Sequence, residues 1–228
     1  MKAFKVFLKV VIPIFFGEFT KYDNANISNE IITKKSFINF QNLNNINGYL
    51  IFSNHLHALD PILIREKLNA FIIAKSNLAN GNKLYKMLEN ALVKALKVIR
   101  YERGNAKNGE EVKEAILQKI NQKNNVLIFP EGDTSYNHKN GLLPLKKGIV
   151  HLSFDNKIPI VLLNIWYSDY NFGQGINNRF SLRKTVIGKK DSELYFEEII
   201  NPNDFNNFNE YFDYINETMN WNAITKYF

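Results

Sequence analysis

Short apolar segments alternate with amphipathic helical segments along this chain, and the alternation constrains its fold more than any other feature. We predict strands at residues 48–53, 70–74, 98–99, 125–129, 158–163 and 193–200. We predict helices at residues 61–68, 84–92, 109–119, 148–154 and 205–219. This order indicates an α/β fold, a layered single domain with a mostly parallel sheet flanked by helices. Such sheets carry their functional residues at the carboxyl ends of the strands.

Composition limits the kinds of chemistry that the chain can perform. A chain of 228 residues is long enough for one domain with a sizeable core. It contains no cysteine, which excludes disulfides, zinc–thiolate sites and a cysteine nucleophile. The formal net charge of +7 favours an anionic partner. The candidates are a membrane surface, a nucleotide-bearing cofactor, an acidic carrier protein or nucleic acid.

The amino-terminal segment, residues 1–22, has the pattern of an amphipathic helix at a membrane interface. Its lysines are interleaved with apolar residues, and its uncharged run, 10–17, is far shorter than the roughly 20 residues that span a bilayer. It lacks the small-residue cleavage site of a signal peptide. A helix packed on the protein's own core is the alternative. We therefore predict an interface segment at 1–22 and a globular domain at 23–228.

The segment Ser53-Asn-His-Leu-His-Ala-Leu-Asp60 follows a predicted buried strand. A histidine at a strand end with a carboxylate one turn later can form a general base and its orienting partner. His55 and Asp60 fit these roles, although His57 is an alternative base. Asp60 could instead cap the helix that begins at Pro61. The spacing alone does not decide between these readings.

A second polar segment, Phe129-Pro-Glu-Gly-Asp-Thr-Ser135, also follows a predicted buried strand. Gly132 allows the backbone to turn closely around a ligand. Glu131 should then project toward the same edge of the sheet as His55. Taken alone, the segment is more typical of an ordinary tight turn rich in Pro, Gly and Asp.

Together, and in this order, the two segments resemble the glycerolipid acyltransferase family, which includes the 1-acylglycerol-3-phosphate O-acyltransferases. The family's Asn-His-x4-Asp motif matches Asn54, His55 and Asp60, and its Phe-Pro-Glu-Gly motif matches 129–132. The family arginine between them corresponds to Arg103, with Arg100 as a second choice. Ile158-Pro-Ile-Val161 resembles a fourth family segment. The resemblance covers roughly residues 48–164.

The resemblance implies transfer of a fatty acyl group from a thioester to a glycerolipid hydroxyl in phospholipid biosynthesis. His55 and Asp60 would be catalytic. The substrate would be bound by Asn54, Arg103, Glu131, Gly132, Lys146 and Lys147. The family implies no bound cofactor, and the donor substrate would be an acyl-CoA or acyl-carrier-protein thioester. We expect a peripheral or monotopic protein at the cytoplasmic face of the cell membrane.

The chain departs from the family pattern in the second motif, and also in the fourth segment, where Leu162 replaces a second proline. Asp133 and Thr134 stand where the family usually has Thr and Arg, so one expected phosphate contact is missing and an anion is added. A carboxylate beside a phosphate dianion is repulsive at low dielectric. Either Lys146 or Lys147 compensates, or the acceptor is a different lyso-lipid or polar molecule.

Other functions fit the sequence less well. The chain has no glycine-rich nucleotide loop and no evident metal-ligand cluster. The carboxyl-terminal aromatic residues lie among acidic residues, which is unfavourable for nucleic acid and more typical of core packing. A non-catalytic lipid-binding relative is a further alternative, although His55, Asp60 and Glu131 are all retained.

Overall fold

The computed structural model describes residues 35–38, 43, 46–56, 60–75, 93, 97–102, 104–135, 142–167 and 192–225. The strands in this part of the chain are β1 (Lys35–Ile38), β2 (Leu50–Ser53), β3 (Phe71–Lys75), β4 (Val98–Tyr101), β5 (Val126–Ile128), β6 (Ile160–Tyr167) and β7 (Ser192–Ile200). The helices are α3 (Asp60–Leu68), α5 (Ala106–Asn121), α6 (Lys147–Asp155), the 3-10 helix η3 (Pro202–Asp204) and α8 (Phe208–Thr225).

The described strands form one sheet in the order β1-β7-β6-β2-β5-β3-β4. From β6 to β4 all neighbouring strands are parallel. β7 runs antiparallel to β6, and β1 runs parallel to β7. The predicted mostly parallel sheet is therefore confirmed. β2 lies centrally between β5 and β6, and all four of its residues are buried, as expected for a strand covered on both faces.

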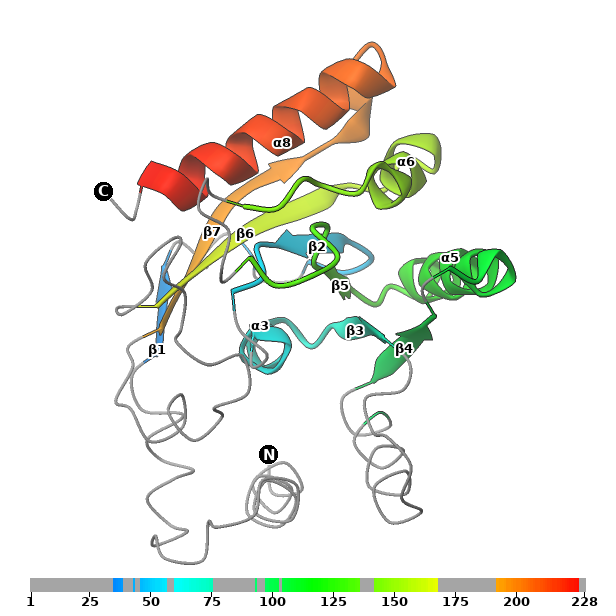
Figure 1. The fold of residues 1–228 in the computed structure, drawn as a ribbon, viewed down its shortest axis with the longest axis horizontal. Coiled ribbons are helices and arrows are strands. Elements are labelled where there is room, and N and C mark those ends of the chain that lie inside the picture. Colours follow the sequence, from blue (N-terminus) through cyan, green and yellow to red (C-terminus); the bar gives the residue numbers. More distant parts are fainter. Residues whose placement is uncertain are drawn as a thin grey trace, which may run out of the picture.

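Helices cover both faces of the sheet (Figure 1). On one face, Ile64 and Leu68 of α3 pack with Ile51 and Leu127 of the central strands. The opposite face is covered by α5, α6 and α8, whose buried residues form a second cluster with alternate residues of the same strands. The sheet thus separates α3 from α8.

Most predicted elements are present with small shifts at their ends. α5 begins three residues earlier than expected, because the Asn105 side chain accepts the Asn108 N–H at 3.1 Å and caps the helix. β6 continues four residues beyond its predicted end. The core role expected for the carboxyl-terminal aromatic residues holds for Tyr211, which is fully buried. β1 was not predicted, because its four residues carry no clear alternation.

Two further predictions fall outside the described residues. These are the interface segment at 1–22, with its boundary to the globular domain, and the helix at 84–92. Within the described part of the chain, the helices are too short or too polar to cross a bilayer.

Candidate active site

The two polar segments lie side by side at the carboxyl end of the central strands. Phe52 of β2 pairs with Ile128 of β5, so the chain leaves both strands at the same level. The residues after β2 begin with Asn54 and His55, and those after β5 lead to Glu131. The parallel sheet therefore brings together groups that are 76 residues apart in sequence.

His55 and Asp60 form a close pair. His55 Nδ1 lies 3.0 Å from Asp60 Oδ2, and the same oxygen accepts the Leu56 N–H at 2.7 Å. An ionised carboxylate only accepts hydrogen bonds, so Nδ1 must carry the proton that it shares with Asp60. The lone pair of the neutral ring is then on Nε2. This is the tautomer that a general base requires.

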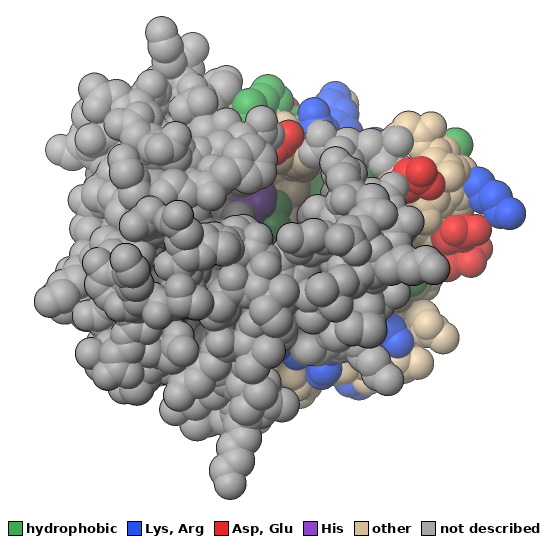
Figure 2. All heavy atoms as spheres, turned by 60° about the horizontal axis from the view of Figure 1, so that its bottom comes forward, with side chains coloured by type: hydrophobic (Ala, Val, Ile, Leu, Met, Phe, Trp, Pro, Cys, Tyr) green, Lys and Arg blue, Asp and Glu red, His purple; other side chains and the backbone are tan. Residues whose placement is uncertain are grey.

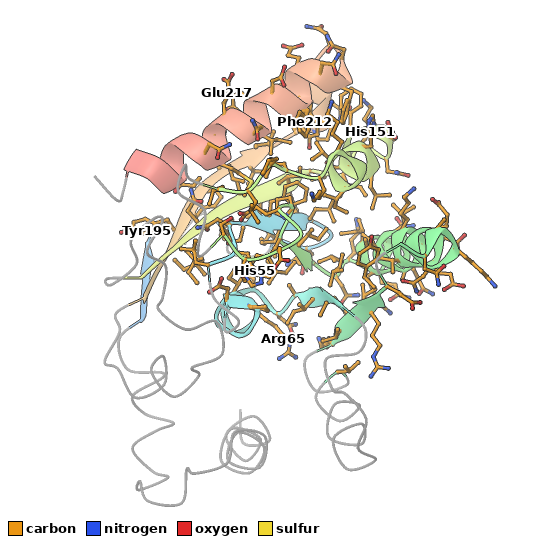
Figure 3. The ribbon with its side chains drawn as sticks, in the orientation of Figure 1. His55, Arg65, His151, Tyr195, Phe212 and Glu217 are labelled. Atoms are coloured by element: carbon orange, nitrogen blue, oxygen red, sulfur yellow. The ribbon has the colours of Figure 1, made fainter. Side chains whose placement is uncertain are left out.

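The His55 ring reaches solvent while its partner does not. The side chain of His55 is 17% exposed and that of Asp60 is fully buried. The ring stacks on Phe129, with 4.1 Å between centroids and 22° between planes. Figure 3 places His55 between α3 and the central strands, and Figure 2 shows histidine atoms recessed below the surface of one face. No described residue hydrogen-bonds to Nε2.

Glu131 holds the backbone of His55. It is 1% exposed, and its Oε1 accepts the His55 N–H at 2.8 Å. Its Oε2 accepts the Leu143 N–H at 3.0 Å and is hydrogen-bonded to Ser135 Oγ. Burial raises the pKa of Glu131 to about 8, although the two backbone hydrogen bonds oppose this rise. In this arrangement the carboxyl group contacts the protein's own backbone and is not open to a substrate.

Ser135 completes the hold on His55. Its N–H donates to the His55 carbonyl oxygen at 2.7 Å, and its Oγ accepts the Leu143 N–H at 2.9 Å. The peptide groups on both sides of the His55 Cα are thus fixed by the segment that follows β5. The orientation of the imidazole depends on that segment as much as on Asp60.

Asn54 is fully buried and joins β2 to β6. Its Oδ1 accepts the Ile165 N–H at 2.7 Å, and its Nδ2 donates to the Ile165 carbonyl oxygen at 3.0 Å. The side chain continues the sheet pairing one step beyond Ser53, the last residue of β2. Asn54 was expected to bind substrate directly, but both ends of its amide are engaged by the backbone of β6.

The turn after β5 carries the glycine that the sequence singled out. Gly132 has a φ of +74°, a conformation that favours glycine. A Cβ at this position would lie 3.5 Å from Cγ and Cε of Lys146. The Lys146 N–H donates to the Pro130 carbonyl oxygen at 2.7 Å. Lys146 is therefore held against the turn that contains Glu131.

Unlike Lys146, Lys147 is directed toward α8, and Asp133 is bonded within its own turn. Lys147 Nζ lies 5.2 Å from the ring centroid of Phe212 in α8, so its charge is directed toward that helix. Asp133 Oδ1 accepts the Thr134 N–H at 2.8 Å, within its own turn. Of the two lysines, only Lys146 has a described contact with the turn after β5.

Two residues of the predicted site lie outside the described part of the chain. These are Arg103, the expected phosphate ligand, and His57, the alternative base. Among the residues that are described, no group of three or more His, Asp or Glu side chains could hold a metal ion.

Most of the described sheet and both polar segments match a known protein family. The family described as Acyltransferase matches residues 36–166, which is more than half of the chain and includes both polar segments. The chain belongs to the acyltransferase family. No curated protein sequence matches this acyltransferase.

The fold has a counterpart among solved structures. It resembles the crystal structure of the 1-acyl-sn-glycerophosphate (LPA) acyltransferase PlsC from Thermotoga maritima, with a TM-score of 0.64. The similarity covers 99% of this chain and 92% of PlsC at 15% sequence identity. At that identity the comparison supports the fold of this acyltransferase and not its substrate.

Ser135, Leu143 and the ring of Phe129 contribute to the site without having been predicted from the sequence. Phe129 and Ser135 stand inside the second polar segment, so their nearness to His55 could have been expected from the parallel sheet. The Leu143 N–H carries no sequence signal, because any residue except proline supplies one.

Glu131 should make stability depend on pH. Its pKa is 4.5 when unperturbed and about 8 in the folded protein, so folding takes up a proton between these values. The free energy of unfolding should therefore fall as pH rises from about 5 to about 8, and this component should be absent from Glu131→Gln. Urea denaturation of both proteins across this range measures the difference. An identical pH slope in the two proteins would contradict the assignment of the buried proton to Glu131.

Proposed function

We propose that this acyltransferase moves a fatty acyl group from an acyl thioester to the hydroxyl of a glycerolipid, with 1-acylglycerol-3-phosphate as its acceptor. One observation carries the proposal. His55 is paired through Nδ1 with a buried carboxylate, while Nε2 is left unbound by the described residues at a recessed surface. This arrangement suits proton abstraction from a hydroxyl group.

The proposed reaction needs no covalent enzyme intermediate. Nε2 of His55 takes the hydroxyl proton as the acceptor oxygen attacks the thioester carbonyl carbon. The carbon–sulfur bond then breaks, and the leaving thiolate takes the proton from the imidazolium. Asp60 stabilises the imidazolium between these two steps. The products are the acylated lipid and the free thiol of coenzyme A or of an acyl carrier protein.

Glu131 and Asn54 act in this proposal by positioning His55 and not by touching the acceptor. The Glu131 carboxyl group binds the His55 N–H, and Asn54 fixes the end of β2 immediately before it. A misplacement of the base by about 1 Å can cost about 100-fold in rate. Both residues should therefore affect kcat more than KM.

Lys146 is the described lysine that we propose binds the acceptor phosphate. It is exposed at the surface, and its side chain runs past Gly132, at the turn that also holds His55 in place through Glu131. Its charge offsets part of the repulsion from Asp133. Arg103, outside the described residues, stays a predicted phosphate ligand, because a guanidinium binds phosphate in a bidentate manner.

A second candidate is an acyltransferase that uses a different lyso-lipid or polar acceptor. The observation that favours it is the pair Asp133 and Thr134 in place of the family's Thr and Arg. A site with one anion more and one guanidinium fewer binds a phosphate dianion less strongly. A non-catalytic lipid-binding relative is disfavoured by the close pairing of His55 with Asp60.

The proposed substrates indicate where in the cell the enzyme acts. A lipid acceptor is presented by a membrane, so we propose peripheral association with the cytoplasmic face of the cell membrane. The net charge of +7 favours anionic lipid. Residues 1–22 supply the predicted interface segment.

Replacement of His55 tests the proposed base. His55→Ala should lower kcat by about 100-fold or more, because general base catalysis contributes about 10²–10⁴-fold. His57→Ala is the matched control and should keep most of the activity. Thioester turnover with purified proteins gives both rates, and thermal unfolding checks that each variant is folded. Retained activity in folded His55→Ala would rule out the proposed mechanism.

Replacement of the turn residues tests the acceptor. Asp133→Thr combined with Thr134→Arg should raise kcat/KM for a phosphomonoester acceptor about tenfold, because a charged hydrogen bond contributes about 1.5–3 kcal/mol. Lys146→Gln should raise KM for the same acceptor about tenfold, and Lys147→Gln should have a smaller effect. The assay compares lysophosphatidic acid, glycerol 3-phosphate and uncharged lyso-lipids, with coenzyme A and carrier-protein thioesters.

The panel also distinguishes the two candidate functions. A wild-type preference for an uncharged lyso-lipid, unchanged by any of these variants, would favour the second candidate. Equal effects of Lys146→Gln and Lys147→Gln would contradict the specific role of Lys146.

A further inference from the structure

The ring of Phe129 covers one face of the His55 imidazole. The two rings lie nearly parallel, with 4.1 Å between their centroids and 22° between their planes. Asp60 is bonded to Nδ1, at the edge of the same imidazole. A contact on the face of the ring leaves the nitrogen atoms at its edge uncovered. Phe129 and Asp60 therefore contact different parts of His55, and neither of them bonds to Nε2.

The fold holds Phe129 in place independently of His55. Phe129 directly follows β5, and its side chain packs against the hydrophobic cluster on the α3 face of the sheet. Its carbonyl oxygen accepts the Gly132 N–H at 3.0 Å, within the turn that also contains Glu131. The segment after β5 thus contacts His55 twice, at the backbone through Glu131 and at the imidazole through Phe129.

Packing alone does not require an aromatic side chain at this position. Phe129 is half-buried, and a leucine also fills a half-buried apolar place beside a sheet. An aromatic ring adds the negative potential of its face, which attracts a cation within about 6 Å of the ring centroid. In the proposed mechanism His55 becomes such a cation, since Nε2 takes the proton of the acceptor hydroxyl and keeps it until the leaving thiolate takes it.

We propose that Phe129 is a positioning residue whose ring face stabilises the charged form of His55 during acyl transfer. The neutral imidazole gains only the attraction between stacked rings, whereas the imidazolium also gains a cation–π attraction. This added attraction exists only while the imidazole is charged. It therefore stabilises the transition state more than the bound substrates, and it raises kcat and not the affinity for substrate. Asp60 stabilises the same charge from the edge of the ring.

This proposal rests on the proposed function, because it requires His55 to be the base. It does not depend on the identity of the acceptor, so the acceptor with the highest turnover serves in the test. Retained activity in folded His55→Ala would overturn both the proposed mechanism and the role of Phe129. Loss of activity in His55→Ala, together with an unaltered kcat when the Phe129 ring is modified, would overturn the role of Phe129 alone.

Fluorinated phenylalanines at position 129 test the face of the ring without removing the ring. Fluorine atoms withdraw electron density from the face and nearly keep the shape of the side chain. In the series from monofluoro- through trifluoro- to pentafluorophenylalanine, kcat should fall stepwise, by about 3- to 30-fold in total, with KM for both substrates nearly unchanged. The matched control is the same series at Phe154, whose ring centroid lies 4.3 Å from Lys157 Nζ. Replacement there should leave kcat unchanged.

Ordinary substitutions supply a second readout. Phe129→Tyr keeps the ring face and should keep kcat within about twofold, whereas Phe129→Leu should lose about as much as pentafluorophenylalanine does. In the His55→Ala background the fluorinated ring should have no further effect on the residual rate, because its charged partner is gone. Thermal unfolding checks that each protein is folded. Wild-type kcat in a folded protein with pentafluorophenylalanine at 129, or an equal loss of kcat from the replacement at 154, would overturn the proposal.

Discussion

A single buried carboxyl group connects the parts of this active site. Glu131 binds the N–H of His55 through one oxygen, and its other oxygen binds the Leu143 N–H and Ser135. Leu143 leads directly to Lys146, whose backbone is in turn bonded to Pro130. One side chain therefore bonds to three segments: the residues after β2, the turn after β5 and the chain that leads to α6. Its removal would delete the bonds to the His55 N–H, the Leu143 N–H and Ser135, and would leave the Ser135 N–H bond to His55 and the Lys146 N–H bond to Pro130.

Glu131 shows how a buried carboxyl group can position a neighbouring backbone without supplying a negative charge. Burial opposes ionisation of Glu131 and raises its pKa to about 8. The groups that donate hydrogen bonds to Glu131 are two backbone N–H groups and a hydroxyl group, and none of them is a cation. Asp60, also fully buried, lies beside an imidazole that becomes positive during the proposed reaction. The two carboxyl groups thus have different tasks, since one fixes the backbone of His55 and the other stabilises its charge.

The sequence predicted the fold class and the meeting of the two polar segments. Parallel pairing of β2 with β5 required only that both be short apolar runs in an α/β order, and the carboxyl ends then coincide. The pairing of His55 with Asp60 was one of two readings, because a helix cap explains the same spacing. The sequence could not show that the Asn54 amide bonds to the backbone of Ile165, 111 residues away. Nor could it distinguish Lys146 from Lys147, since their directions depend on how α6 packs on α8.

In the proposed mechanism the Asp60 carboxylate holds His55 as a base whose Nε2 is not bonded to any described residue. The most direct test is the turnover of purified Asp60→Asn with a thioester donor and 1-acylglycerol-3-phosphate. An amide at this position can keep the hydrogen bond from the Leu56 N–H but cannot stabilise the imidazolium. We expect kcat to fall by about 10²–10⁴-fold, with KM nearly unchanged and the protein still folded. A folded Asp60→Asn with wild-type kcat would contradict the role of Asp60 in this mechanism.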